Sequence, residues 1–153
     1  MNKRIDSVHF RLAAVFGLLV LAVPIGCTTN NPQNQAAASA GSSQLAKEMI
    51  GTWVHVGRPG QVMEPPTTGG RLKFRTGRHW TLTRADGDGL VVEHFGGTYT
   101  LNGNEYVETQ DYGDETWKKD NGKSFKFLVK IEGDTMTQFG VDNPWTEVWK
   151  RVR

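Results

Sequence analysis

The chain has 153 residues, a length that corresponds to one domain and at most two. Lys and Arg number 18 against 16 Asp and Glu, but three of those bases and only one acid lie in residues 1–26. The remainder is balanced at 15 charges of each sign, so a basic nucleic-acid-binding domain is not supported and no nucleic-acid partner is expected. A single Cys excludes an intrachain disulfide framework and a cysteine-based metal cage.

Residues 1–26 have the organisation of a secretory signal peptide. Lys3, Arg4 and Arg11 supply a positive n-region, and an apolar run of 12 residues follows over 12–23. A membrane-spanning helix needs about 20 apolar residues, so this run is too short to span. We therefore expect the segment to be removed from the mature protein.

The apolar run ends at Pro24-Ile25-Gly26-Cys27, which resembles the lipobox of bacterial lipoproteins, although Pro24 stands where that family usually has Leu, Val or Ile. The resemblance implies that Cys27 is lipidated, since two or three acyl chains anchor a protein firmly where one does not. It implies a periplasm-facing protein of the bacterial cell envelope. Thr28, in place of an Asp, favours the outer membrane. The alternatives are an ordinary cleaved signal peptide and a retained anchor helix.

Residues 27–43 form the second region, which begins at the cysteine that we expect to be lipidated. After Cys27, the segment contains no charged, aromatic or large aliphatic side chain. Such a segment cannot bury enough apolar area to offset the entropy of ordering it. We expect a flexible tether.

Residues 44–153 predict an all-β domain after a short helix over 45–50. Segments rich in Val, Thr, Tyr, Phe and Trp alternate there with Gly, Asn and Asp turns. The expected strands are 51–57, 71–76, 78–85, 90–95, 98–102, 105–112, 123–132, 135–141 and 145–152. Short, regularly spaced strands favour an antiparallel up-and-down meander, closed into one barrel of about 8–10 strands. Closure also removes exposed sheet edges.

The turns assign the faces of the strands. A two-residue turn at Gly133-Asp134 pairs Ile131 with Met136 and Val129 with Gln138, which places these side chains inside. The same rule predicts that the apolar side chains of strand 71–76 point inward and its cations outward. The apolar pair is Leu72 and Phe74, and the cations are Arg71, Lys73 and Arg75.

Both ends of the domain resemble a known group. Gly51-Thr52-Trp53 resembles the Gly-x-Trp that begins the first strand of lipocalins and related calycin barrels, and Trp149-Lys150-Arg151-Val152 resembles their last strand. Motifs between them resemble uncharacterised lipocalin-like domains of bacterial envelope proteins, over about residues 48–153. The resemblance implies that Trp53 and Arg151 (or Lys150) close one end of the barrel by cation–π stacking.

Little in the sequence points to catalysis. His55, His79 and His94 lie on separate expected strands, so neither a metal site nor haem is expected. Nucleophile motifs and a Gly-rich phosphate cradle are absent. We expect a non-enzymatic protein without a cofactor. A small hydrolytic or isomerising enzyme with a buried Glu, such as Glu108, remains as an alternative.

Two loops stand out. Gly57–Gly70 is long for a compact barrel, and long loops are often functional, so Val62 and Met63 are expected to form a flap over the barrel mouth. Asp111–Asp120 mixes acids with lysines and predicts a solvated loop.

The leading hypothesis is a barrel that binds a small, mostly apolar ligand, with Glu108 or Gln138 fixing one polar end. The candidate ligand-binding residues are Trp80, Tyr99, Tyr106, Glu108, Phe127 and Gln138. The alternative is a protein-interaction or inhibitor barrel that acts on an envelope protein through its surface loops. A cavity of ~300 Å³ or more favours the ligand, whereas a filled interior with an exposed apolar loop favours the partner protein.

Overall fold

The computed structural model describes residues 43–153. The expected signal peptide, the lipidated Cys27 and the tether up to residue 42 lie outside the described residues. A helix over residues 43–49 leads into β1, and no helix in the described part of the chain has the length and apolar composition needed to cross a bilayer. The further elements are β1 (Gly51–Arg58), β2 (Gln61–Val62), β3 (Gly70–Arg75), β4 (His79–Ala85), β5 (Val91–Asn102), β6 (Glu105–Gly113), the 3₁₀ helix η1 (Lys118–Asp120), β7 (Ser124–Glu132), β8 (Thr135–Val141) and β9 (Glu147–Arg151).

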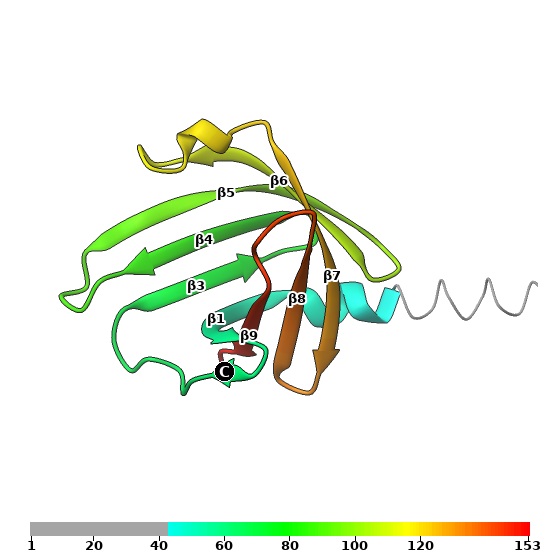
Figure 1. The fold of residues 1–153 in the computed structure, drawn as a ribbon, viewed down its shortest axis with the longest axis horizontal. Helices are drawn as coiled ribbons and strands as arrows, with labels where there is room; N and C mark the ends of the chain where they lie inside the picture. Colours follow the sequence, from blue (N-terminus) through cyan, green and yellow to red (C-terminus); the bar gives the residue numbers. More distant parts are fainter. Residues whose placement is uncertain (1–42) are drawn as a thin grey trace, which may run out of the picture.

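Eight of the strands form a closed ring, in the order β1-β3-β4-β5-β6-β7-β8-β9 (Figure 1). Each strand is antiparallel to its neighbour, and β9 closes the ring on β1 by pairing Trp53 with Arg151. The short β2 pairs with the end of β1, outside this ring. The expected all-β, up-and-down barrel is confirmed. The ring and the core that it encloses lie within the described residues 43–153.

The expected break between strands 90–95 and 98–102 is wrong, because β5 runs through it as one strand. The pairing of β5 with β6 shifts register between Gly96 and Gly97. A Cβ atom on Gly97 would lie 2.1 Å from the Thr109 carbonyl oxygen. These glycines therefore serve a β-bulge with close backbone contact, and not a turn.

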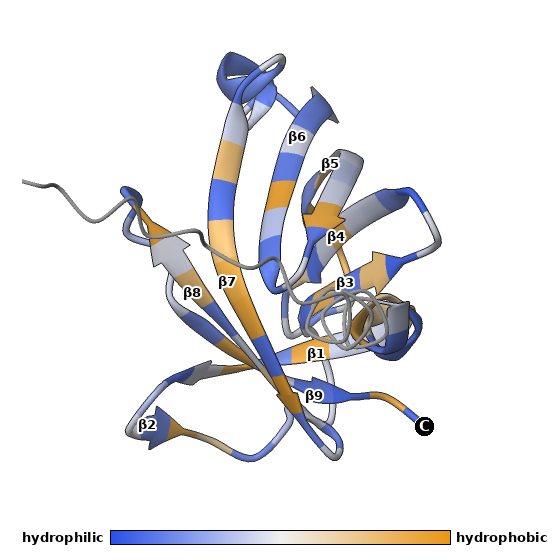
Figure 2. Ribbon diagram, turned by 90° about the vertical axis from the view of Figure 1, so that its right-hand side faces the viewer, coloured by the Kyte–Doolittle hydropathy of each residue, from blue (hydrophilic) through white to orange (hydrophobic). Residues whose placement is uncertain are grey.

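The register predicted for the β7–β8 hairpin is confirmed. Ile131 pairs with Met136 and Val129 with Gln138, and the inward-facing Val129, Met136 and Gln138 are all buried. Hydrophilic bands interrupt a largely hydrophobic β7 (Figure 2), and its middle band is wide because the outward-facing Leu128 is also apolar. The tight turn thus specified the faces correctly.

The faces predicted for β3 are wrong. Lys73 and Arg75 are each 2% exposed inside the barrel, whereas Phe74 is 38% exposed. Leu72 packs away from the main core, against a small cluster that contains Val54. The physical reason is that Glu108, on the opposite side of the interior, supplies the charge that these cations need when buried.

One end of the barrel is closed by the helix over residues 43–49. Met49 is fully buried in the core, and its carbonyl oxygen accepts a hydrogen bond of 3.0 Å from Trp53 Nε1. The Arg151 guanidinium lies 4.2 Å from the centre of the Trp53 ring, and it also donates to the Ile50 carbonyl oxygen. The connections β1–β3, β4–β5, β6–β7 and β8–β9 lie at the other end, which we call the open end (Figure 1).

Candidate functional site

A cavity of about 50 Å³ lies inside the barrel towards the open end. At about 10–15 Å³ for each water-sized group, it has room for roughly three to five such groups. Lys73, Glu108 and Gln138 contribute its polar lining, and Trp117, Phe125 and Trp145 are among its aromatic residues. The lining thus combines buried polar groups with an apolar wall.

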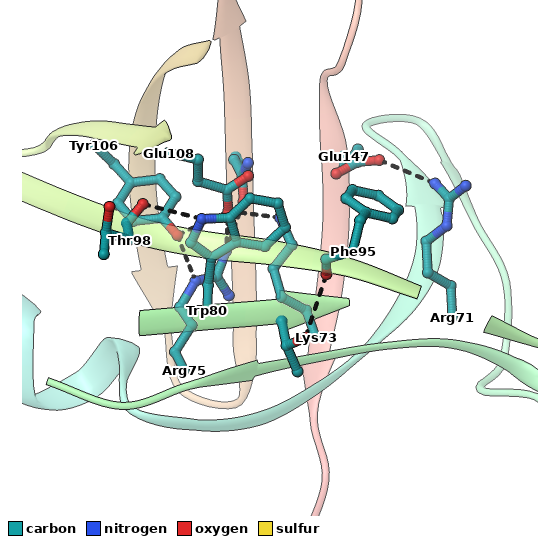
Figure 3. A network of polar contacts seen from close by, with 11 residues as sticks. Arg71, Lys73, Arg75, Trp80, Phe95, Thr98, Tyr106, Glu108 and Glu147 are labelled. Carbon is teal, nitrogen blue, oxygen red and sulfur yellow. Dashed lines mark hydrogen bonds and ion pairs between the residues drawn. The ribbon is translucent and has the colours of Figure 1, made fainter. Parts of the chain in front are cut away.

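A charged network occupies the deep part of this interior (Figure 3). Glu108 Oε1 lies 2.7 Å from Lys73 Nζ and 3.5 Å from Arg75 Nη2. The same oxygen accepts a 2.7 Å hydrogen bond from the Tyr106 hydroxyl, which in turn accepts one of 3.1 Å from Arg75 Nε. These contacts join β3 and β6, which are three strands apart in the order of the ring, across the barrel interior.

Burial alters the ionisation of this network. Desolvation lowers the pKa of Lys73, although the neighbouring carboxylate of Glu108 opposes that effect. Desolvation also raises the pKa of Tyr106 well above its ordinary value, so its hydroxyl keeps the proton that it donates. The Lys73 ammonium further lies 5.1 Å from the Trp80 ring centre and 5.0 Å from that of Trp149. Such contacts favour a charged lysine in an apolar setting.

Gln138 carries the clearest unmet hydrogen-bonding capacity in the cavity lining. Its Oε1 accepts a 2.8 Å hydrogen bond from Arg75 Nη2, which fixes the orientation of the amide because the reverse orientation would oppose two donors. Gln138 Nε2 is then left without a partner. Among the described residues, the other buried side-chain atoms in this condition are Arg75 Nη1, Trp117 Nε1 and Trp149 Nε1, and all are N–H donors.

Aromatic side chains form the rim of the cavity at the open end. Trp117 stacks on Phe95 with ring centres 4.4 Å apart, and Trp145 meets Phe125 edge-on at 4.8 Å. Gln110 Nε2 holds this arrangement by donating to the Trp117 carbonyl oxygen at 2.7 Å.

The expectation of a solvated loop over Asp111–Asp120 is wrong in two respects. Its first residues continue β6, and its last form η1. Trp117, between them, packs against the barrel core. The charged residues around Trp117 in the sequence gave no sign of this packing.

The candidate residues named from the sequence divide into two groups. Those that line the cavity are Trp80, Glu108, Phe127 and Gln138. Tyr106 lies fully buried beside them and does not line it, and the Tyr99 hydroxyl donates to the Thr76 carbonyl oxygen instead.

Val62 and Met63 lie beside β1. Val62 pairs with Gly57, and the Met63 amide donates to the Val56 carbonyl oxygen at 2.8 Å. Their side chains are 50% and 69% exposed, and neither lines the cavity.

Several site residues escaped the sequence analysis, chiefly Lys73, Arg75, Trp117 and Trp145. One signal was present for the first two, because Arg71, Lys73 and Arg75 alternate and must share a face of their strand. With Glu108 already placed inside, that cationic face was a candidate counterpart. Nothing in the sequence near Trp117 or Trp145 marked them as lining residues.

Two other kinds of site are less well supported. Within residues 43–153, no three His, Cys, Asp or Glu side chains come together as a metal-binding group. A larger hollow of about 340 Å³ lies on the outer face of β3–β6, lined in part by Phe74 and Tyr112. No unpartnered buried polar atom belongs to its lining, so the interior cavity is the better candidate.

The chain was compared with protein-family models, with curated proteins and with solved structures. The chain matches no protein-family model, and a search of the curated proteins finds no match. Among solved structures, it is similar to a lipocalin-like protein from Bacteroides uniformis, with 13% identity and a TM-score of 0.49 over 69% of this chain and 99% of that one.

Proposed function

We propose that this protein is a lipid-anchored barrel of the bacterial envelope that binds a small, mostly apolar molecule with one polar end. The observation that carries the proposal is the interior cavity, where Gln138 Nε2 faces no protein acceptor and aromatic side chains form the rim. Ligand sites characteristically combine an apolar wall with a few convergent polar groups.

The size of the cavity limits how the ligand binds. At about 50 Å³, it does not reach the ~300 Å³ expected above of a ligand-binding barrel, which is the volume that encloses a whole drug-sized molecule. The interior therefore takes only one end of the ligand, and the body lies along Trp117 and Trp145 at the rim.

An environment-sensitive apolar dye tests this function. Residues 44–153 are purified, and dye emission and Trp quenching are followed during titration. We expect saturable one-to-one binding that small apolar molecules displace. A folded domain that leaves the dye emission unchanged would count against binding in the barrel.

The proposal assigns no reaction to the chain. Glu108, the carboxylate of the enzyme alternative, directs Oε1 at Lys73, Arg75 and Tyr106. Its contacts serve to hold the interior together.

A protein partner is a second candidate, supported by exposed apolar side chains at the open end. Met63 is 69% exposed, Leu90 67% and Val91 54%. Where such side chains gather into one contiguous patch, they mark an interaction site. Capture of an envelope protein by the intact domain, lost when Gly57–Gly70 is shortened, would favour this function over ligand binding.

Membrane anchoring at Cys27 is the part of the proposal that gives the protein its location. Acylation there would hold the barrel at the outer membrane, on its periplasmic side. We expect Cys27→Ser to release the protein in soluble form or to leave it unprocessed. Fractionation of cells checks this, and a variant that still needs detergent for extraction, at the processed size, would contradict it.

A further inference from the structure

We propose that the hollow on the outer face of β3–β6 is a second binding site, and that it takes an alkylated ammonium group such as that of choline. This site is separate from the interior cavity and does not depend on the proposed function. Three observations carry the inference, namely an unpaired carboxylate, aromatic side chains beside it, and hydroxyl groups that already have partners.

A β-bulge places two side chains of β6 at the hollow. Gly96 pairs with Tyr112 and Gly97 with Gln110, so Asp111 is the extra residue of the bulge. A Cβ atom on Gly97 would lie 3.0 Å from Asp111 Oδ2, and one on Gly96 would lie 2.6 Å from the Tyr112 hydroxyl oxygen. Bulges redirect side chains in this way. The two glycines thus leave room for Asp111 and Tyr112, which both line the hollow.

Asp111 gives the hollow a negative charge that no neighbour balances. Among residues 43–153, its carboxylate forms no salt bridge and accepts no hydrogen bond. Neither Lys nor Arg belongs to the lining, and His79 is the one lining residue that can carry a positive charge. The hollow therefore complements a cation and opposes an anion.

Aromatic side chains supply the apolar walls. Phe74 is 38% exposed and Tyr112 42% exposed, and both line the hollow. Its volume of about 340 Å³ reaches the ~300 Å³ of small-molecule sites. Aromatic rings attract organic cations, and quaternary ammonium groups are recognised in this way. Rings beside a carboxylate are thus a suitable environment for an alkylated ammonium group.

The hydroxyl groups of the hollow already have partners. Thr76 Oγ1 donates to the His79 carbonyl oxygen at 3.4 Å and accepts from the His79 amide at 3.2 Å. Thr81 Oγ1 donates to the Phe95 carbonyl oxygen at 3.3 Å, so the Tyr112 hydroxyl donates to Thr81. A sugar presents many hydroxyl groups, each a donor and an acceptor, and would find few partners here. An alkylated ammonium group needs only the carboxylate and the rings.

Choline and 3,3-dimethylbutan-1-ol test the inference, because they share a shape and differ in the charge at one atom. The full chain, purified in a nonionic detergent, is titrated with each by calorimetry, with detergent alone as the blank. We expect choline to bind with a Kd of about 1 mM, since water screens the exposed Asp111. The neutral alcohol should bind roughly tenfold or more weakly, because it lacks the charge that the rings and the carboxylate attract.

Asp111→Asn is the decisive variant, because it keeps the shape of the side chain and removes its charge. We expect it to weaken choline binding roughly tenfold and to leave binding of the alcohol unchanged. Asp88→Asn is the matched control, since it removes the same charge from the exposed β4–β5 turn, outside the lining, and it should change neither affinity. Should Asp111→Asn fail to fold, Phe74→Leu keeps an apolar wall without the ring, and it should weaken choline binding roughly threefold.

Phosphocholine distinguishes two sources of the ammonium group. It carries the phosphate of a lipid head group, so binding as tight as that of choline admits a head group as the ligand. Weaker binding restricts the site to free amines. Both results support an ammonium site.

The remaining outcomes decide the inference. Choline binding that exceeds binding of the alcohol, and that Asp111→Asn or Phe74→Leu weakens, supports the site. A folded protein that does not bind choline, that binds choline and the alcohol equally, or whose choline binding survives both substitutions overturns it. Each of these results leaves the proposed function standing, since that function rests on the interior cavity.

Discussion

Glu108 is the residue on which the polar interior depends. Its Oε1 accepts hydrogen bonds from Lys73, Arg75 and the Tyr106 hydroxyl, and its side chain is only 5% exposed. Sequence reasoning placed Glu108 and Gln138 inside the barrel because turn geometry fixes their faces. Their cationic partners could not be found in the same way, since the alternation of apolar and charged residues in β3 favours the opposite face. A long-range charge pairing overrides that local rule.

We expect Glu108→Gln to destabilise the domain by about 3–5 kcal/mol, because two buried cations would lose their only anion. Urea unfolding followed by Trp fluorescence measures the change. The double variant Lys73→Met with Glu108→Gln removes one cation as well, and it should recover part of the loss. A single variant as stable as the natural protein would contradict the role given to Glu108.

At the scale of elements, β5 and the β7–β8 hairpin show what the sequence could and could not predict. The hairpin has a two-residue turn that fixes its register, and the predicted pairs are those observed. In β5, the pair Gly96-Gly97 resembles a turn, yet the strand continues through it. Glycine marks both turns and sites of close backbone contact, and only the neighbouring strand decides between them.

Gly97→Ala tests this interpretation of β5. A Cβ atom there would meet the Thr109 carbonyl oxygen at 2.1 Å, so we expect a loss of roughly 1–3 kcal/mol from strain. Gly87→Ala is the matched control, since a Cβ atom at that turn position meets nothing within 4 Å. Thermal unfolding compares the two, and equal melting temperatures would rule out a requirement for close contact at β5.

At the scale of the whole molecule, the barrel is closed at one end and accessible at the other. Trp53 joins the beginning and the end of the barrel, because it donates to the Met49 carbonyl oxygen and stacks against Arg151. The resemblance of the terminal motifs predicted the stacking of Arg151 on Trp53. It did not predict the hydrogen bonds that Arg151 donates to the carbonyl oxygens of Glu48 and Ile50. The size of the cavity could not be predicted, since it depends on how the side chains of all strands fill the interior.

We expect Trp53→Ala to cost about 3–5 kcal/mol, because it removes a fully buried ring and the stacking partner of Arg151. Replacing the exposed Val62 and Met63 together by Ser should change the stability little. Denaturant melts of both variants provide the comparison. A Trp53→Ala melt within error of the natural protein would exclude a closing role for the ring.

The most direct test of the central claim, that a ligand enters the barrel and accepts from its free donors, uses the indole N–H signals in a nitrogen–proton correlation spectrum. Trp117 Nε1 is unpartnered in the cavity lining, whereas Trp53 and Trp80 already donate to carbonyl oxygens. On titration with the apolar dye, we expect the Trp117 signal to shift to saturation while the signals of Trp53 and Trp80 stay nearly fixed. An unmoved Trp117 signal at dye concentrations that saturate the change in dye emission would contradict binding in this cavity.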